Sequence, residues 1–286
     1  MDNSGGFNPP PPPPPPGGGM GGGSGGALPA RGLGDILSAA FEIYKNNAAK
    51  LITIVAVVVV PLQFVLHLLT GVVFAAKKDT VVIGNIQVTE TVARSAGVAL
   101  LVLLIGLIIG VIINSALQAA IIRAAAQTTV GDPVDVSESY RFGFAHFGSV
   151  LLASILVGIV VAVGFVLLIV PGVIFLTMLA VTIPVVVIER KGVTDAMSRS
   201  WALAKGNFWH VLGTVVVAAI ITSVVGGAIG AIGGNNWFLA WIFGSIGQII
   251  AAPFSAMVTV LLYLDLRTRS ESLTVDALRM ELASNS

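Results

Sequence analysis

Hydrophobic residues fill four long stretches without an Asp, Glu, Lys or Arg, at residues 51–76, 95–122, 148–188 and 211–264. A single helix over the third stretch would be roughly 60 Å long, about twice the thickness of a hydrocarbon core. Its one break is the turn dipeptide Pro171-Gly172. The stretch therefore predicts a hairpin of two spans, at residues 149–170 and 173–188. Each arm is expected to be helical, because backbone groups in lipid have no water to bond.

The polar turn at residues 233–236 divides the fourth stretch in the same way, into spans at residues 211–232 and 237–264. The first two stretches supply the remaining spans, at residues 51–76 and 95–122. In the polar segment between them, residues 81–83 and 86–88 suit a small β-hairpin around Gly84-Asn85. The pattern thus predicts an all-α polytopic membrane protein with six transmembrane helices in three hairpins.

Composition agrees with a membrane protein and excludes several classes of function. Hydrophobic residues make up 56% of the chain and charged residues 10%, against about 25% charged residues in soluble domains. A net charge of +1 without a long basic run gives no reason to expect nucleic acid as a partner. The chain has no cysteine, and its three histidines lack metal-ligand spacing. We therefore expect no metal and no cofactor.

The positive charges are distributed unevenly between the two sides of the predicted spans. Twelve of the fifteen lysines and arginines fall on the side of the chain termini, and Lys77, Lys78 and Arg94 fall on the other. The positive-inside bias therefore predicts that both termini are cytoplasmic.

The two ends of the chain differ in composition from the predicted membrane domain at residues 31–269. Residues 1–30 are rich in proline and glycine, with eight consecutive prolines from Pro9 to Pro16. Such a segment buries little apolar area, so it is predicted to be a disordered cytoplasmic tail. Binding to a proline-recognising partner is the alternative interpretation. Residues 270–286 are predicted to form a cytoplasmic C-terminal tail.

A short pattern with steps of four, four and three residues recurs before each predicted hairpin. Its members are Leu33, Leu37, Phe41 and Tyr44; Val136, Tyr140, Phe144 and Phe147; and Val193, Met197, Trp201 and Ala204. These steps place each quartet on one face of a helix. We therefore predict three copies of one unit, an amphipathic cytoplasmic helix followed by a transmembrane hairpin. Chance similarity between amphipathic helices is the alternative explanation.

Local signals agree with these short helices. Asp135 with Glu138 is typical of a capping pair, Thr194 could cap the third helix, and Gly206 could end it. Asp195 and Arg199 have the spacing of a helical ion pair. The third member of each quartet is predicted to be an interfacial aromatic anchor. These anchors are Phe41, Phe144 and Trp201.

Several of these segments resemble one bacterial family. The similarity is carried by the sequences LIVPGV at 168–173, PVVVIE at 184–189, DA at 195–196, SWAL at 200–203 and KGNFW at 205–209. They resemble the membrane domain of bacterial glycerophosphoryl diester phosphodiesterases and its stand-alone actinobacterial relatives, over roughly residues 31–269. The resemblance implies a multi-pass protein of the bacterial plasma (inner) membrane.

The fused members of that family carry a soluble catalytic barrel, and we expect no room for one after Arg269. Phosphodiesterase activity and its catalytic residues therefore do not carry over. The sequence also lacks a Gly-x-Ser-x-Gly motif, a His-Glu-x-x-His motif and a P-loop. We predict that the protein is not an enzyme.

Polar side chains inside the predicted spans are the candidate site residues. Gln63 and His67 share one face of the first span, at a depth of roughly 18–24 Å, and Asn114 and Gln118 share one face of the second, at roughly 6–12 Å. The difference in depth predicts that the two pairs do not form one site. Gln248 lies near the depth of His67 and could meet it. Hydrogen bonding between helices is the simplest role for all five.

Arg123, Glu189 and Asp265 lie where spans end at the predicted cytoplasmic face. We expect them to anchor the spans in the interface, with pairing to each other or to lipid headgroups left open. The leading functional hypothesis is a non-enzymatic membrane scaffold that interacts with the lipid bilayer or with partner proteins. The alternative is a transporter or permease-like protein for a small or lipidic substrate. A transporter requires a cavity near the middle of the membrane, whereas a scaffold does not.

Overall fold

A computed structural model describes residues 28–74, 77–83, 86–92, 96–234 and 236–284. Apart from turns and short connections, this part of the chain is helical, with one two-stranded sheet. The strands are β1 (Lys77–Ile83) and β2 (Ile86–Val92). The helices are α1 (Leu33–Phe74), α2 (Ala96–Thr129), α3 (Val136–Leu167), α4 (Ile169–Met178), α5 (Thr182–Ile188), α6 (Val193–Lys205), α7 (Phe208–Ala231), α8 (Trp237–Glu271) and α9 (Val275–Ser284).

Six helical segments are long and apolar enough to cross a membrane. They are Leu33–Leu66, Leu104–Thr129, Val136–Leu167, Ile169–Ile188, Phe208–Ala231 and Trp237–Glu271. Large apolar side chains on these segments face outward, among them Val57, Ile108, Ile159 and Val224. The prediction of an all-α, multi-pass membrane protein in contact with the lipid bilayer is therefore confirmed.

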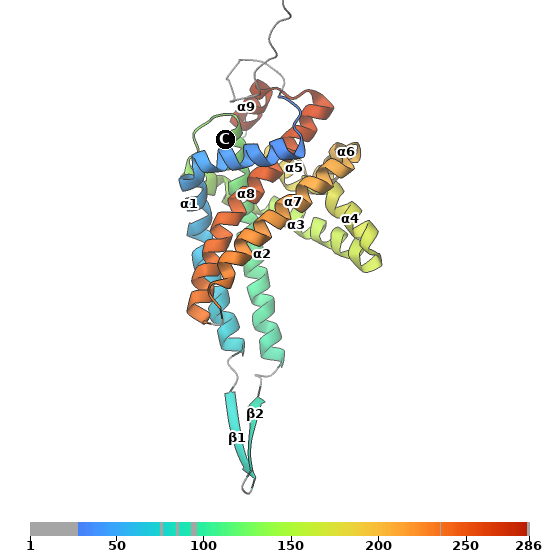
Figure 1. The fold of residues 1–286 in the computed structure, drawn as a ribbon. Coiled ribbons are helices and arrows are strands. Elements are labelled where there is room, and N and C mark those ends of the chain that lie inside the picture. Colours follow the sequence, from blue (N-terminus) through green and yellow to red (C-terminus); the bar gives the residue numbers. More distant parts are fainter. Residues whose placement is uncertain (1–27, 75–76, 84–85, 93–95, 235, 285–286) are drawn as a thin grey trace, which may run out of the picture.

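The long helices pack against their neighbours in the chain, α1 with α2, α2 with α3, α3 with α4 and α7 with α8, and α1 also packs along α8. The start of α1, α6 and α9 lie at one end of the molecule, which we call the termini end (Figure 1). At the opposite end, β1 and β2 project beyond α1 and α2 as an antiparallel hairpin. The predicted strand pairing is confirmed, with Val81 opposite Val88, although the turn residues Gly84-Asn85 lie outside the described residues.

The hairpin of α3 and α4 turns three residues earlier than predicted. The backbone reverses at Leu168, which is extended (φ −165°, ψ 156°), and not at Pro171-Gly172. Pro171 instead lies in the first turn of α4, where a missing N–H is tolerated because it would have no intrahelical partner. The returning arm is also not one helix, since residues 179–181 separate α4 from α5.

The amphipathic segments are less separate than predicted. The first two run without interruption into the following span, in α1 and α3, and only α6 is a helix of its own, because Gly206-Asn207 interrupts it before α7. In Figure 1 the start of α1 lies across the termini end, and the rest of the helix runs along the bundle. Asp135 caps α3 as predicted, by accepting from the N–H of Glu138 at 3.0 Å. The predicted cap Thr194 is wrong, because Gly192 holds that position at α6.

The buried core is concentrated towards the termini end. It includes one position of the repeat that is small and buried in all three copies, occupied by Ala40, Gly143 and Ser200. Small side chains at this position let each amphipathic segment lie close to the helices beneath it. This agreement lies outside the quartets that suggested the repeat.

At both ends of the chain, residues that were predicted to belong to a tail pack against the bundle. Leu28 packs against the core and its N–H donates to the carbonyl of Leu273 at 2.9 Å. After α8, helix α9 buries Leu278 and Leu282 in the same core. Residues 270–284 are therefore a packed extension of the bundle. Residues 1–27, which hold the proline run, lie outside the described residues.

Candidate functional site: an amide-lined cavity beside a charged layer

A cavity of about 830 Å³ lies between α1, α2 and α8, with Ala180 and Ile183 of the returning arm at one side. This volume is in the range of small-molecule sites. Its walls are mostly apolar, and Gly106 and Gly110 leave space on the α2 side. The polar residues in the wall are Gln63, Asn114, Gln118, Gln248, Ser255 and Thr259. Every lining residue that the structure describes is uncharged.

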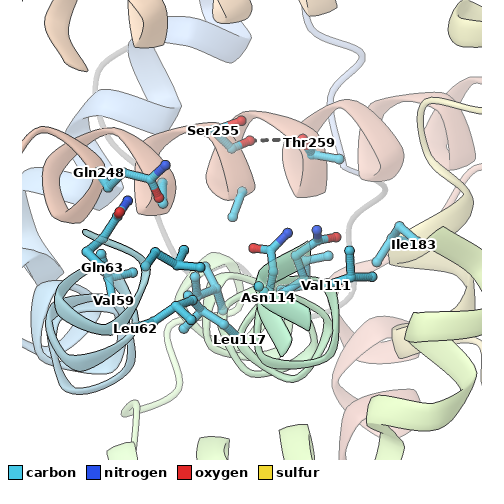
Figure 2. A pocket seen from close by; sticks show the side chains of 18 of the residues that line it. Val59, Leu62, Gln63, Val111, Asn114, Leu117, Ile183, Gln248, Ser255 and Thr259 are labelled. Atoms are coloured by element: carbon cyan, nitrogen blue, oxygen red, sulfur yellow. Dashed lines mark hydrogen bonds between the residues drawn. The ribbon is translucent and has the colours of Figure 1, made fainter. Parts of the chain in front are cut away.

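Four of the five predicted intramembrane positions line this cavity. Figure 2 shows Gln63 of α1 and Gln248 of α8 pointing toward one another, with Asn114 pointing from α2 toward α8. Gln63 of the first pair thus shares one cavity with both members of the second pair, contrary to what their depths predict. The cavity extends along α8 from Gln248 to Thr259, roughly 16 Å at the helical rise, so groups at both depths reach it.

His67 belongs to α1, but its side chain lies outside the part of the structure that is described. Its predicted meeting with Gln248 stays a prediction. Sequence reasoning missed Ser255 and Thr259, although a signal was present. Gln248, Ser255 and Thr259 are spaced by seven and four residues, which puts them on one face of a helix. The Thr259 hydroxyl donates to the carbonyl of Ser255 at 2.9 Å, which leaves its lone pairs able to accept (Figure 2).

The amides can recognise a ligand in both hydrogen-bonding directions. A Gln or Asn side chain carries two donors and one acceptor oxygen. Within low-dielectric surroundings, such groups favour a polar but uncharged partner, because a buried charge without a counter-charge is far more costly. The cavity is therefore suited to hydroxyl, ester or amide groups attached to an apolar body.

A charged layer lies beyond the cavity, at the termini end. Its first centre is Asp265, whose side chain is fully buried. The carboxylate accepts from the Arg31 N–H at 2.6 Å and the Arg269 Nε at 2.8 Å, and it lies 3.0 Å from His210 Nε2. Arg269 also donates to the Arg31 carbonyl at 2.7 Å. Asp265 thus joins the chain before α1, the start of α7 and the end of α8.

The second centre is Glu189, whose side chain is only 6% exposed. Its carboxylate is bonded by Lys191 and the Tyr263 hydroxyl, each at 2.9 Å, and by Arg199 Nε at 3.3 Å. Burial raises the pKa of Glu189, but the hydrogen bonds from Lys191 and Tyr263 and the charges of Arg199 and Arg267 outweigh it and hold the pKa below its ordinary value.

Arg199 and Arg267 extend this second centre to neighbouring helices. Arg199 bonds Glu271 as well as Glu189, so the predicted pairing of Arg199 with Asp195 is wrong. Arg267 donates to Glu281 of α9 at 2.7 Å and to the Tyr263 hydroxyl at 3.1 Å. These charges link the C-terminal end of α5 to helices α6, α8 and α9.

Arg123 is also buried at the termini end. It donates to Glu138 at 2.9 Å, and its guanidinium lies 4.4 Å from the ring centre of Phe142. Arg123, Glu189 and Asp265 therefore pair inside the protein with other elements. The structure thus pairs each of the three with other side chains of the protein, and their anchoring of spans in the interface stays a prediction.

The three predicted aromatic anchors lie at the surface. Phe41 and Phe144 are 60% and 65% exposed, and Trp201 is 36% exposed with its ring 6.1 Å from that of Phe175. Outward-facing aromatic rings at the start of membrane helices are compatible with contact to lipid. Their role as anchors stays a prediction.

Residues 150–264 match the family described as "Membrane domain of glycerophosphoryl diester phosphodiesterase". The resemblance seen in the sequence is thereby confirmed for most of α3 through α8. Comparisons with curated proteins and with solved structures returned no match. Helices α1 and α2, which supply much of the cavity wall, lie outside the matched residues.

Proposed function

We propose that this membrane protein binds a neutral lipid, such as a diacylglycerol, in the amide-lined cavity and neither makes nor breaks a bond in it. The observation that carries the proposal is the convergence of Gln63, Asn114, Gln118 and Gln248 on one mostly apolar space. The amides would bond the ester and hydroxyl groups of the ligand, and the apolar wall would cover the start of its chains. A phosphate-bearing lipid fits poorly, because no lining residue in the described part of the chain carries a charge to pair with it.

A photoactivatable diacylglycerol tests this proposal. With its reactive group beside the glycerol, it should label in nanodiscs the residues of α1, α2 and α8 that line the cavity, such as Asn114 and Gln248, and a phosphatidic acid with the same reactive group should not label those residues. Gln63→Leu combined with Gln248→Leu should abolish this labelling, while Thr53→Val, on α1 but outside the cavity, should leave it unchanged. Equal labelling of the double variant and the original protein would refute the proposal.

Movement of the lipid between leaflets is the second candidate, which continues the transporter alternative. The roughly 16 Å extent of the cavity along α8 favours it, because that length is about half of a hydrocarbon core. Proteoliposomes that contain a fluorescent diacylglycerol would distinguish the candidates. If the protein moves the lipid, exchange between leaflets should be faster in its presence, and Gln63→Leu with Gln248→Leu should remove this increase. If the protein only binds the lipid, exchange should be unchanged.

We also propose that both termini are cytoplasmic, on the basis of the distribution of lysine and arginine. The chain has no cysteine, so single cysteines can be introduced freely. In intact cells, an impermeant thiol reagent should label Lys78→Cys and Asn236→Cys and should not label Gly131→Cys or Gly192→Cys. Labelling at Gly192 would contradict this orientation.

A further inference from the structure

Two further apolar grooves, each of about 510 Å³, lie at the surface of the bundle. The first is formed by the start of α3 over α1 and α2, and the second by the start of α1 over α7 and α8. Each groove is therefore covered by the amphipathic segment of one unit and floored by the hairpin of another.

The covering side chains of the two grooves come from the same positions of the repeat. Tyr140, Phe144 and Phe147 line the first groove, and Leu37, Phe41 and Tyr44 line the second. These are the last three members of the second and first quartets. The quartets thus have a structural counterpart, because in both units they face a groove of the same volume.

The floors of the grooves correspond as well. Pro61, Leu62 and Val65 of α1 line the first groove, and Ile221, Thr222 and Val225 of α7 line the second. Each residue of the second set follows its counterpart in the first by the same number of positions in the sequence. Val193, which begins the third quartet, follows Leu33, which begins the first, by that same number. The two grooves are equivalent sites in a threefold-repeated structure, in which the first unit closes on the third.

The third equivalent position is filled by an aromatic ring. There α6 lies against α3 and α4, and Trp201 contacts Phe175. Gly164 takes the place that Pro61 and Ile221 have in the other units, and a Cβ on it would lie 2.7 Å from the Phe175 ring. The Phe175 side chain therefore occupies the space that is open in the two grooves.

The chemistry of the grooves identifies a hydrocarbon occupant. Among their polar groups, the Tyr140 hydroxyl already donates to the carbonyl of Ile54 and the Thr222 hydroxyl to that of Ala218. The others are the hydroxyls of Ser38 and Tyr44. Such a lining offers little to a peptide backbone or a sugar. The outer walls also continue into the lipid-facing surface, where Val65 and Val225 are 42% and 38% exposed.

We propose that each groove holds one acyl chain of a membrane lipid from the leaflet on the side of the termini. The aromatic members of the quartets then clamp that chain from above, while Phe175 takes its place in the third unit. Two lipids are held in this way, and the grip is on the chain and not on the headgroup. These sites are separate from the amide-lined cavity, although Leu62 and Leu117 lie in the walls of both the cavity and the first groove.

Native mass spectrometry of the full chain released from phosphatidylcholine nanodiscs counts the retained lipids. We expect two for the original protein, and the same number from phosphatidylglycerol nanodiscs. Val65→Trp and Val225→Trp fill one groove each and should each reduce the count by one. Val57→Trp and Val216→Trp, on the same helices and exposed outside the grooves, should leave it unchanged.

Phe175→Ala supplies the opposite test, because removing the ring opens the third position and should raise the count to three. An unchanged count in Phe175→Ala together with unchanged counts in both tryptophan variants would overturn the proposal. A count that depends on the headgroup, or a lipid-free dimer in place of lipid-bound monomers, would also overturn it. The dimer would show that a second copy of the chain fills the grooves.

Discussion

The termini end and the middle of the bundle use polar side chains in opposite ways. At the termini end, charged groups are buried and bonded to one another, as Asp265 is to Arg269 and to the Arg31 backbone. In the middle, the polar groups are uncharged and border an open cavity, as Gln63 and Gln248 do. The first set therefore links the helices to one another, and the second lies where the proposed ligand would bind.

Removing a carboxylate at the termini end should have the largest effect on stability. Asp265→Ala leaves His210 and Arg269 without their shared partner and should lower the free energy of unfolding by about 3–5 kcal/mol, the usual result of breaking a buried pair. Gln248→Leu should change it by no more than about 1 kcal/mol. Denaturation with SDS in mixed micelles measures both. A larger loss of stability in Gln248→Leu than in Asp265→Ala would show that the middle of the bundle, and not the termini end, holds the helices together.

Substitutions on the two faces of the amphipathic segments should have the next largest effect. Phe144→Asp and Trp201→Asp should each lower stability in nanodiscs by about 1.5–3 kcal/mol, because an aromatic side chain at the lipid-facing surface is replaced by a charge that lipid does not solvate. Ser137→Asp and Ser198→Asp, on exposed positions of the same helices, should change it by about 0.5 kcal/mol at most. Equal tolerance on both faces would remove the support for lipid contact.

Acidification tests the second charged centre. Because the pKa of Glu189 lies below its ordinary value, its ionised form stabilises the fold above the ordinary glutamate pKa of about 4.3. That contribution is lost as the pH falls through the lowered pKa of the folded state. The melting temperature of the original protein should therefore fall more steeply below about pH 4.3 than that of Glu189→Gln. Parallel pH curves would show that Glu189 is not stabilised as an anion.

Truncation at the N-terminus should give the smallest effect and locate the edge of the folded part. Deleting residues 2–26 should leave the melting temperature unchanged. Deleting residues 2–31 also removes the bonds of Leu28 to Leu273 and of Arg31 to Asp265, so it should lower the melting temperature. A fall with the shorter deletion would show that the proline-rich segment contributes to stability.

The hydrophobic pattern was sufficient to predict the helical class and the six candidate spans, because uncharged stretches of this length report directly on the membrane. Details that depend on tertiary contacts were not predictable. The turn at Leu168 is one example, since Pro171 suits the first turn of a helix as well as a turn between helices.

The polar residues show the same limit. Arg123, Glu189 and Asp265 stand out in the sequence only as charges at the ends of spans, because their roles depend on distant partners, such as His210 for Asp265. Gln63, Asn114, Gln118 and Gln248 were recognised individually. Their common cavity was missed. Counting residues along a helix gives the depth of each side chain in the membrane, but it does not show how far a cavity between helices extends.

The most direct test of the division between a structural layer and a binding cavity is the stability of the protein with and without diacylglycerol. A ligand that binds only the folded state at a hundred times its Kd adds about 2.7 kcal/mol. We predict that dioctanoylglycerol stabilises the original protein, but not Gln63→Leu with Gln248→Leu, whose stability without ligand is nearly that of the original. Equal stabilisation of both proteins, or of neither, would contradict the account.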